Sequence, residues 1–557
     1  MIAVLLSLLP LLVVGILLIG LRWPAARVMP LSYITILLVG YFYWQLPPAQ
    51  LAAATVNGLI VCASLLYIIF GAILLLNTLS ESGGLARIRA GFLAISPDRR
   101  VQVIIIAWLF GSFMEGAAGF GTPAVICVPL LIGLGFPARA AVIAGMMIQC
   151  TPVSFGAAGT PILIGVDKGL AATETLQSEL SAIYGTLERR EILEQIGLRV
   201  ALLHGVIGTV IPLAIVATLT RLFGEERSFK QGLRIWKFAI FAALAMIIPY
   251  VTIAFLLGPE FPTLIGSLIG LAIVIPAARS RFLCPEEPWD FPPKETWLDG
   301  WTGDYAIEPQ LGTQMPLAVA WGPYLLTAAL LVLTRLPGLG LDAFLKTFTL
   351  PPTGEPLQNL FGSNISASPI PYLYLPAAVF IVSSLFAVML HRMPAAAFRT
   401  ALFRSSRLMI PTSAALVFTV PMVQIFINSG GGAGVEQDMP TVLANAAAQA
   451  SGTWWPLFSP AIGGLGAFVA GSNTVSNMMF AQFQFQTGVQ IGVNPLWIVA
   501  EQAVGGAAGN TICVHNVVAA CAVGGLFGRE GGILRVTSFL FLYYVTAAGL
   551  IGLFLVR

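Results

Sequence analysis

Residues 111–121 read GSFMEGAAGFG, a glycine-rich run with a single acidic residue, Glu115, near its centre. Apolar sequence continues on both sides of it, from residue 101 to residue 166, and does not divide into helices of ordinary membrane-spanning length. Irregular backbone at membrane depth persists only where it is buried in protein or lines a cavity. The run therefore predicts a broken, re-entrant segment inside a helical membrane protein.

The composition of the whole chain supports a membrane location. Of its 557 residues, 57% are hydrophobic and 10% are charged, whereas about 25% of residues are charged in an average soluble domain. The formal net charge of +3 is too small to suggest a nucleic-acid partner. No polar stretch of domain size interrupts the apolar pattern, so we predict one transmembrane domain over residues 1–557.

The apolar segments predict the number of spans. A bilayer core of about 30 Å requires roughly 20 apolar residues per helix. Two stretches, 101–166 and 455–525, are too irregular for whole helices, and each is expected to supply one crossing and one re-entrant hairpin. We therefore predict an all-α fold with about twelve transmembrane helices and two re-entrant hairpins. The ten regular spans are 3–21, 28–46, 59–79, 198–220, 238–257, 262–278, 316–335, 371–391, 408–428 and 533–556.

The orientation follows from the short basic loops, because Lys and Arg collect on the cytoplasmic side. Twelve spans place every basic cluster on one side and leave both termini outside. The longest loops, 167–197 and 279–315, mix both charge signs and are given no role in the chemistry. The basic clusters are Arg22 with Arg27; Arg87, Arg89, Arg99 and Arg100; Arg221, Arg227, Lys230, Arg234 and Lys237; and Arg392, Arg399, Arg404 and Arg407.

The two irregular stretches resemble each other. Three short matches occur in the same order, at offsets of 360 (471 − 111), 358 (495 − 137) and 350 (506 − 156). With the charge-based orientation, the copies form inverted repeats with cores at 101–166 and 455–525, an architecture typical of secondary transporters. The alternative is that glycine and alanine strings recur by chance and only pack helices. The matched pairs are Gly111-Ser112 with Gly471-Ser472, Pro137 with Pro495, and Gly156-Ala157-Ala158-Gly159 with Gly506-Ala507-Ala508-Gly509.

Three ionisable residues in these stretches are candidates for proton coupling. A charged side chain at membrane depth is costly, so such residues are functional by default. Glu115 is the leading proton carrier, and its alternative is a structural carboxyl satisfied by backbone N–H groups. Glu501 and His515 are a candidate second titrating pair, since histidine changes charge near neutrality. The alternative for His515 is a neutral hydrogen-bonding group.

The other polar side chains of the two stretches are candidates for substrate binding. Half-helix N-termini offer free N–H groups and a positive dipole end, which suit a carboxylate. No Lys or Arg is assigned to the interior of either stretch, so helix ends and neutral donors are expected to hold an anion. The candidates are Ser112, Gly116, Thr122, Gln149, Ser154, Thr160, Ser472, Asn473, Thr474, Asn477, Gln502, Asn510 and Asn516.

Motifs for other classes of protein are missing from the sequence. It contains no P-loop and no HExxH pattern, and its six cysteines lack zinc-ligand spacing. A membrane-embedded enzyme needs a clustered nucleophile and base, whereas the three histidines lie far apart. We therefore expect no enzyme activity, no metal and no cofactor.

The run at 111–121, together with GAAGN at 506–510, resembles the bacterial L-lactate permease family. The chain length and the order of the two cores also match. The resemblance implies a multi-pass protein of the bacterial cell (inner) membrane that takes up L-lactate and related small 2-hydroxy monocarboxylates, such as glycolate, by proton symport. It also implies an elevator-type transporter of the wider ion-transporter superfamily, in whose relatives a homodimer is one frequent assembly.

A motif of that superfamily bears on the coupling ion. In sodium-coupled dicarboxylate relatives, a Ser-Asn-Thr motif in each repeat lines the sodium and carboxylate sites. Ser472-Asn473-Thr474 matches it, whereas we place Ser112-Phe113-Met114 at the equivalent position of the first repeat, with Glu115 one residue beyond. This departure favours protons over sodium. A sodium-coupled carboxylate symporter and a passive channel remain the alternatives.

Overall fold

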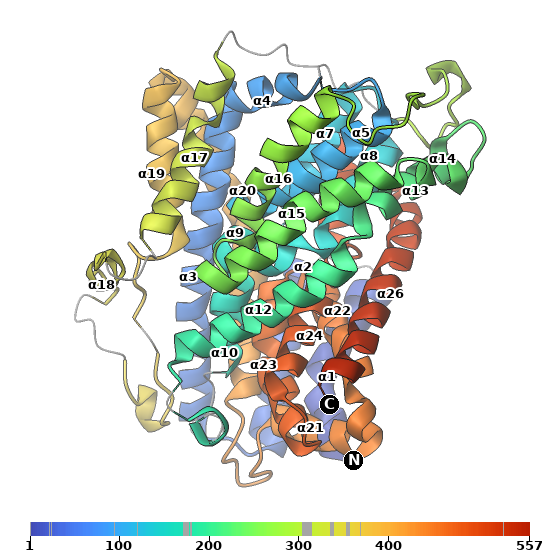
Figure 1. Ribbon diagram of the computed structural model, residues 1–557. Coiled ribbons are helices and arrows are strands. Elements are labelled where there is room, and N and C mark those ends of the chain that lie inside the picture. The colour runs from blue at the N-terminus through green and yellow to red at the C-terminus, as the bar shows by residue number, and fades with distance from the viewer. Residues whose placement is uncertain are drawn as a thin grey trace.

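The computed structural model describes residues 2–21, 23, 25–93, 95–119, 121–170, 178, 181–185, 187–303, 315–334, 339–351, 357–367, 369–526 and 528–556. These residues fold into a bundle of helices (Figure 1). Among them, β pairing is limited to two isolated bridges, Leu350 with Ile370 and Leu357 with Ala367. The predicted all-α class is therefore confirmed.

The helices before and within the first irregular stretch are short except for α3. They are α1 (Ile2–Val14), η1 (Gly15–Gly20), α2 (Ala25–Leu38), η2 (Val39–Tyr43), α3 (Pro48–Glu81), α4 (Gly84–Leu93), α5 (Arg99–Val103), η3 (Ile104–Phe110), α6 (Gly111–Ala118), α7 (Thr122–Gly133), α8 (Ala138–Met147), η4 (Ile148–Cys150), η5 (Pro152–Phe155), α9 (Gly156–Thr160), η6 (Pro161–Val166) and α10 (Asp167–Leu170).

The central part of the chain contains longer helices, and the second irregular stretch is again divided. The central elements are α12 (Arg189–Gly208), α13 (Ile211–Phe223), α14 (Phe229–Leu233), α15 (Trp236–Leu257), α16 (Pro262–Arg279), η7 (Lys294–Thr296), α17 (Leu317–Leu333), α18 (Leu341–Lys346), η8 (Leu360–Gly362), α19 (Pro376–Leu390) and α20 (Ala395–Ile427). The last elements are α21 (Met439–Ser451), η9 (Gly452–Leu457), α22 (Ser459–Ala470), α23 (Asn473–Gln490), α24 (Pro495–Gly509), α25 (Val514–Gly524) and α26 (Glu530–Leu555).

Each of the ten predicted regular spans coincides with helical structure. Within the described residues, six helices are long and apolar enough to cross a membrane, or seven if the bent pair Ala138–Cys150 and Pro152–Leu170 is one span. Several other predicted spans coincide with apolar helices of 10–17 residues, so the count of about twelve stays a prediction. The six are Pro48–Glu81, Arg99–Ala118, Arg189–Phe223, Trp236–Leu257, Pro262–Arg279 and Glu530–Leu555.

Small residues let the long helices pack closely. The helix α3 lies against both α19 and α20, and α22, α23 and α24 pack on one another. A Cβ atom on Gly71 of α3 would lie 2.9 Å from the Cα of Ala377 in α19, so a larger residue would force these helices apart. A continuous buried core runs from the first irregular stretch through α12, α15, α16 and α24.

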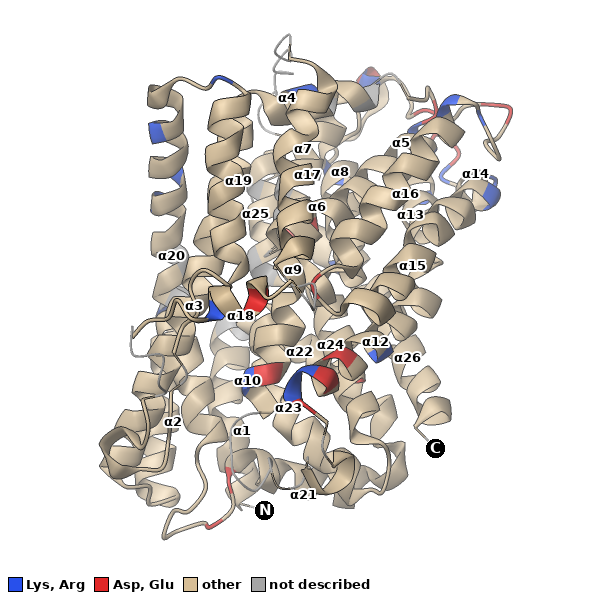
Figure 2. Ribbon diagram, turned by 60° about the vertical axis from the view of Figure 1, so that its left-hand side comes forward, with Lys and Arg blue, Asp and Glu red and all other residues tan. Residues whose placement is uncertain are grey.

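Charge is distributed unevenly along the bundle. Lys and Arg occur on α4 and α14 and on the adjoining part of α20, at one end of the molecule (Figure 2). Both chain termini lie toward the opposite end (Figure 1). The structure therefore separates the termini from the basic end, as the charge pattern of the sequence predicts.

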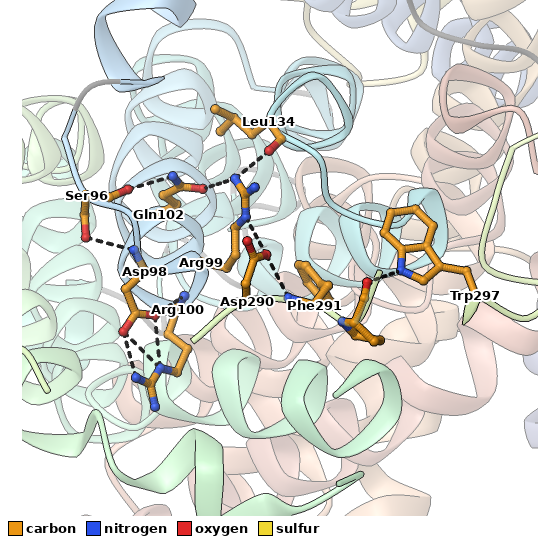
Figure 3. A network of polar contacts seen from close by, with 10 residues as sticks. Ser96, Asp98, Arg99, Arg100, Gln102, Leu134, Asp290, Phe291 and Trp297 are labelled. Carbon is orange, nitrogen blue, oxygen red and sulfur yellow. Dashed lines mark hydrogen bonds and ion pairs between the residues drawn. The ribbon is translucent and has the colours of Figure 1, made fainter. Parts of the chain in front are cut away.

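At this basic end, ion pairs attach the first hairpin to the loop after α16 (Figure 3). The Asp98 side chain caps α5 by accepting from the backbone N–H of Arg100 at 2.9 Å, and it also pairs with the Arg100 guanidinium at 2.7 Å. Arg99 donates to the carbonyl of Leu134 at 2.5 Å and to Asp290 at 2.9 Å. The ends of α5 and α7 are therefore held together, and both are held to residue 290.

Candidate substrate site

Four interruptions of the helices meet at one place inside the bundle. They lie between α6 and α7, within residues 156–160, between α22 and α23, and after α24. Residues from all four line a single small pocket. We call it the central pocket; its lining residues are Glu115, Gly119, Gly121, Val153, Gly156, Ala157, Thr160, Pro161, Gly471, Ser472, Asn473, Thr474 and Asn510.

The two hairpin tips have the same backbone conformation. Gly121, before α7, has φ 75° and ψ 8°, and Gly471, before α23, has φ 76° and ψ 7°. This left-handed region is disfavoured for residues with a Cβ atom, so glycine is needed at both tips. The two hairpins lie toward opposite ends of the bundle, with α7 near the basic end and α22 and α23 in the half that holds the termini (Figure 1).

The structure corrects the register of the predicted repeat. Gly111 lies inside continuous helix, with φ −61° and ψ −42°, and is therefore not equivalent to Gly471. Pairing Gly471 with Gly121 gives an offset of 350 (471 − 121). The GAAG strings share this offset (506 − 156), but residues 506–509 are helical within α24 whereas Ala157 and Ala158 have positive φ, so these strings match in sequence and not in conformation. Ser472-Asn473-Thr474 thus corresponds to residues 122–124, Thr-Pro-Ala, and the first repeat still departs from the Ser-Asn-Thr motif.

Glu115 is buried beside the first hairpin tip. Only 1% of the residue is exposed. Its second oxygen, Oε2, has no hydrogen-bond partner among the described residues. A Cβ atom on Gly156 would lie 2.5 Å from Oε1, so the carboxyl group fills the space that a side chain at residue 156 would need. The pocket therefore contains an acid with spare hydrogen-bonding capacity.

The N-terminus of α23 forms the opposite wall of the central pocket. Ser472 is the N-cap residue, but its side chain makes no capping hydrogen bond, so the first N–H groups of this 18-residue helix lack that partner. Asn473 donates to the carbonyl of Ala503 at 3.2 Å, and its Oδ1 atom has no partner among the described residues. Thr474 also lines the pocket. The free N–H groups and the helix dipole favour a bound anion here.

Amide side chains continue this polar wall behind the pocket. Asn516 donates to Asn510 Oδ1 at 3.2 Å and to Gln149 Oε1 at 2.9 Å, which connects the second repeat to the first. Thr160 donates to the carbonyl of Ala157 at 2.6 Å. Asn477 donates to the carbonyl of Pro161 at 3.1 Å, and its Oδ1 atom is unpartnered within the described residues. The structure thus gathers most of the predicted polar residues around one site.

Some predicted substrate residues lie elsewhere. Gly116 faces α16, where an added Cβ atom would lie 2.7 Å from the backbone nitrogen of Leu264, so this glycine serves helix packing. Ser112 is fully buried on α6 but does not line the central pocket. Ser154 bonds to His204 at 2.8 Å and to the carbonyl of Ala503 at 3.1 Å, behind the break.

Four more candidates either lie within the second stretch, away from the central pocket, or have side chains outside the described part of the chain. Gln502 donates to the Ser476 hydroxyl at 3.0 Å and is part of a network within the second repeat. Glu501 is fully buried on α24, facing Gly552 of α26, with neither carboxyl oxygen bonded to a described residue. The side chains of Thr122 and His515 lie outside the described part of the chain, so the pairing of Glu501 with His515 stays a prediction.

A second, larger cavity adjoins the central pocket and contains charges that the sequence analysis did not assign to a site. It has a volume of about 390 Å³ and shares Thr160 with the central pocket. The charged lining residues are Asp167, Lys168, Arg189, Arg190, Glu260 and Lys346. Both ends of the 167–197 segment, to which the sequence analysis gave no role, therefore line a cavity next to the central pocket. The pair Asp167-Lys168, directly after the first irregular stretch, was the available signal.

The whole chain can be compared with known families. A family model described as L-lactate permease matches residues 3–557. The chain belongs to the L-lactate permease family. Its relatives include a putative L-lactate permease of Haemophilus influenzae, 31% identical, with 91% of this chain and 89% of that protein covered. The L-lactate permease of Escherichia coli K12 is 27% identical over 90% and 86%, and the glycolate permease GlcA of that strain is 26% identical over 94% and 90%.

As a member of a permease family with several apolar helices of spanning length, the protein is a multi-pass membrane protein. The family match covers both irregular stretches and therefore the whole central pocket. Solved structures resemble this permease only loosely: the MtrF protein of Neisseria gonorrhoeae is 12% identical with a TM-score of 0.42, covering 88% of this chain and 80% of that one.

Proposed function

We propose that this permease takes up L-lactate and related 2-hydroxy monocarboxylates, such as glycolate, across the bacterial cell membrane together with a proton. The observation that carries the proposal is the central pocket, which combines the buried Glu115 carboxyl with the uncapped N-terminus of α23. The named activities of the relatives, L-lactate and glycolate permeases, agree with a small carboxylate as the ligand.

In this proposal the substrate carboxylate binds at the N-terminus of α23, where N–H groups and the helix dipole favour an anion. Asn473, Thr474 and Asn510 lie on the same wall and offer hydrogen bonds to the carboxylate or to the 2-hydroxyl group. Val153 supplies an apolar part of the lining for the substrate carbon chain. The pocket thus supports a small anion with one polar end.

The proton is coupled through Glu115. A carboxylate substrate and an ionised Glu115 in one small pocket repel each other, and neither has a cationic partner in the pocket lining. Protonation of Glu115 removes this repulsion and makes its Oε2 atom a hydrogen-bond donor for the substrate. The pocket then carries the single charge of the substrate, and release of both partners restores the empty state.

We further propose that the two hairpins move together as an elevator-type core. The α6–α7 and α22–α23 hairpins meet tip to tip at the pocket, and they extend toward opposite ends of the bundle. The long helix α3 packs against both α19 and α20, and these three helices would form the scaffold. A shift of the core along this scaffold would expose the pocket first to one side of the membrane and then to the other.

A sodium-coupled symporter is the second candidate, and one observation favours it. The Oδ1 atoms of Asn473 and Asn477 both lack a hydrogen-bond partner within the described residues. Both atoms lie near Gly506, and a Cβ atom added to this glycine would collide with Asn473 Oδ1. Neutral oxygen atoms of this kind suit a hard cation. Sodium would then be carried beside the substrate in place of a proton.

Uptake of radiolabelled L-lactate into proteoliposomes separates these functions. With an inward proton gradient and no sodium, the wild-type protein should accumulate L-lactate, and an uncoupler should abolish the accumulation. Accumulation that requires a sodium gradient and ignores pH would replace proton coupling by sodium coupling. Equilibration without accumulation under either gradient would indicate a channel.

A further inference from the structure

The large cavity beside the central pocket, which we call the vestibule, lies between α3 and the ends of α10 and α12. Its inner wall includes Ala158 and Thr160, and Thr160 also lines the central pocket. Charged residues on α10 and at the start of α12 lie inside the half of the molecule that holds the termini (Figure 2). A substrate that passed through the vestibule would meet these charges before it reached the break at residues 157–160.

Two arginines in the vestibule are held in different ways. Arg190 donates to both carboxyl oxygens of Glu260, at 2.6 and 3.0 Å, and to Glu194 at 2.6 Å, so two protein carboxylates occupy its guanidinium. Arg189 pairs with one carboxylate, that of Asp167, at 2.5 Å. It also donates to the backbone carbonyl of Asp167.

The Asp167–Arg189 pair is accessible from the vestibule. The side chains are 19% and 37% exposed, respectively, whereas Glu260 is fully buried. Lys168 lies 3.9 Å from the other oxygen of Asp167, so this carboxylate has a second cation beside it. If Asp167 leaves Arg189, it still has Lys168 as a partner. The vacated guanidinium remains anchored through the carbonyl of residue 167.

We propose that Arg189 is a second carboxylate-binding station, at which an incoming monocarboxylate displaces the Asp167 side chain before it passes Thr160 into the central pocket. This inference rests on the proposed function. The exchange replaces one carboxylate on Arg189 by another, so no charge is left unpaired in the vestibule. A planar guanidinium suits a carboxylate because it presents two parallel N–H donors.

The proposal predicts shifts of opposite sign in two variants of the same ion pair. Arg189→Gln removes the station and should raise the half-saturating external L-lactate concentration about tenfold. Asp167→Asn weakens the internal competitor and should lower that concentration several-fold, since Arg189 keeps its backbone anchor. If the pair were only structural, both variants would lose transport in the same direction.

Lys346→Gln is the matched control. Lys346 also lines the vestibule but pairs with Asp342 at 3.3 Å and lies 4.7 Å from the ring centroid of Tyr374. Removing the Lys346 charge should change the half-saturating concentration by less than about twofold. If the vestibule attracted the anion only through its overall positive charge, Lys346→Gln and Arg189→Gln would have equal effects at low ionic strength.

The test is the initial rate of L-lactate uptake by proteoliposomes over a range of external concentrations, with thermal unfolding of each variant measured alongside. Opposite shifts in half-saturation at unchanged melting temperature are expected. The proposed binding station would be refuted by shifts of half-saturation in the same direction for the two ion-pair variants, or by a loss confined to the maximal rate. Equal effects of Lys346→Gln and Arg189→Gln would also refute it. Failure of the wild-type protein to take up any monocarboxylate would instead refute the proposed function.

Discussion

The number of protons that accompany each substrate anion depends on which buried acids face the central pocket. Among its described lining residues, Glu115 is the one titratable side chain. Glu501 is also buried, but it faces α26 and does not line the pocket. We therefore expect one proton per monocarboxylate. The transported pair is then electrically neutral.

This stoichiometry sets a measurable accumulation ratio. One pH unit supplies about 1.4 kcal/mol per proton, so one-to-one symport should concentrate L-lactate about tenfold for each unit of imposed pH difference. A membrane potential should have no effect on a neutral pair. If one net charge moved instead, 100 mV would contribute about 2.3 kcal/mol, or roughly fifty-fold.

The assay is steady-state accumulation in proteoliposomes with imposed pH steps, at a membrane potential clamped by potassium and an ionophore. Glu115→Gln should lose pH-driven accumulation while it still exchanges internal for external L-lactate. Glu501→Gln should keep the tenfold ratio. A hundredfold ratio per pH unit that responds to potential, or full accumulation by Glu115→Gln, would show that Glu115 is not the single coupling acid.

Three further changes test other parts of the structure. Gly471→Ala should destabilise the protein by about 1–2 kcal/mol, because alanine is strained in the left-handed conformation, and it should also reduce uptake. Gly492→Ala is the control, since this glycine has φ 70° and an added Cβ atom would meet nothing within 4 Å. This variant should lose stability in thermal unfolding without a loss of uptake. Asn473→Ala should raise the half-saturating concentration if this residue binds substrate, and should abolish any sodium dependence if it binds sodium. Arg190→Gln removes the main partner of the fully buried Glu260 carboxylate. The protein should lose about 2–3 kcal/mol of stability, less than the roughly 3–5 kcal/mol typical of a broken buried ion pair, because the Arg190 side chain is one-third exposed. The double change with Glu260→Gln should recover most of that loss, and equal melting temperatures for the single and double variants would contradict this.

The predicted sites of irregular backbone follow from local chemistry, and the structure bears them out. Glycines at 119, 121 and 471 mark the two hairpin tips because left-handed backbone disfavours a Cβ atom. Glu115 could be singled out from the sequence, because an ionisable side chain in an apolar membrane segment is costly and is therefore expected to have a function. Apolar composition likewise determined the positions of the regular helices, since a bilayer requires about 20 apolar residues.

Tertiary packing decided the register of the repeat and which of the candidate residues line the central pocket. Gly-Ser occurs at both 111 and 471, and only the backbone angles show that Gly121 is the true counterpart. Gly116 has the same local setting as its neighbours but faces α16, because a helix presents each residue to a different surface.

The chain by itself thus determined a helical membrane protein with two glycine-rich interruptions and a short set of polar candidates. The tertiary structure alone decided that all four interruptions meet, for example through the bond from Asn477 to the carbonyl of Pro161, 316 residues away in sequence. It also placed Arg189 in the vestibule. Composition and spacing report local preferences, whereas convergence of distant segments depends on how helices pack, which no short stretch of sequence encodes.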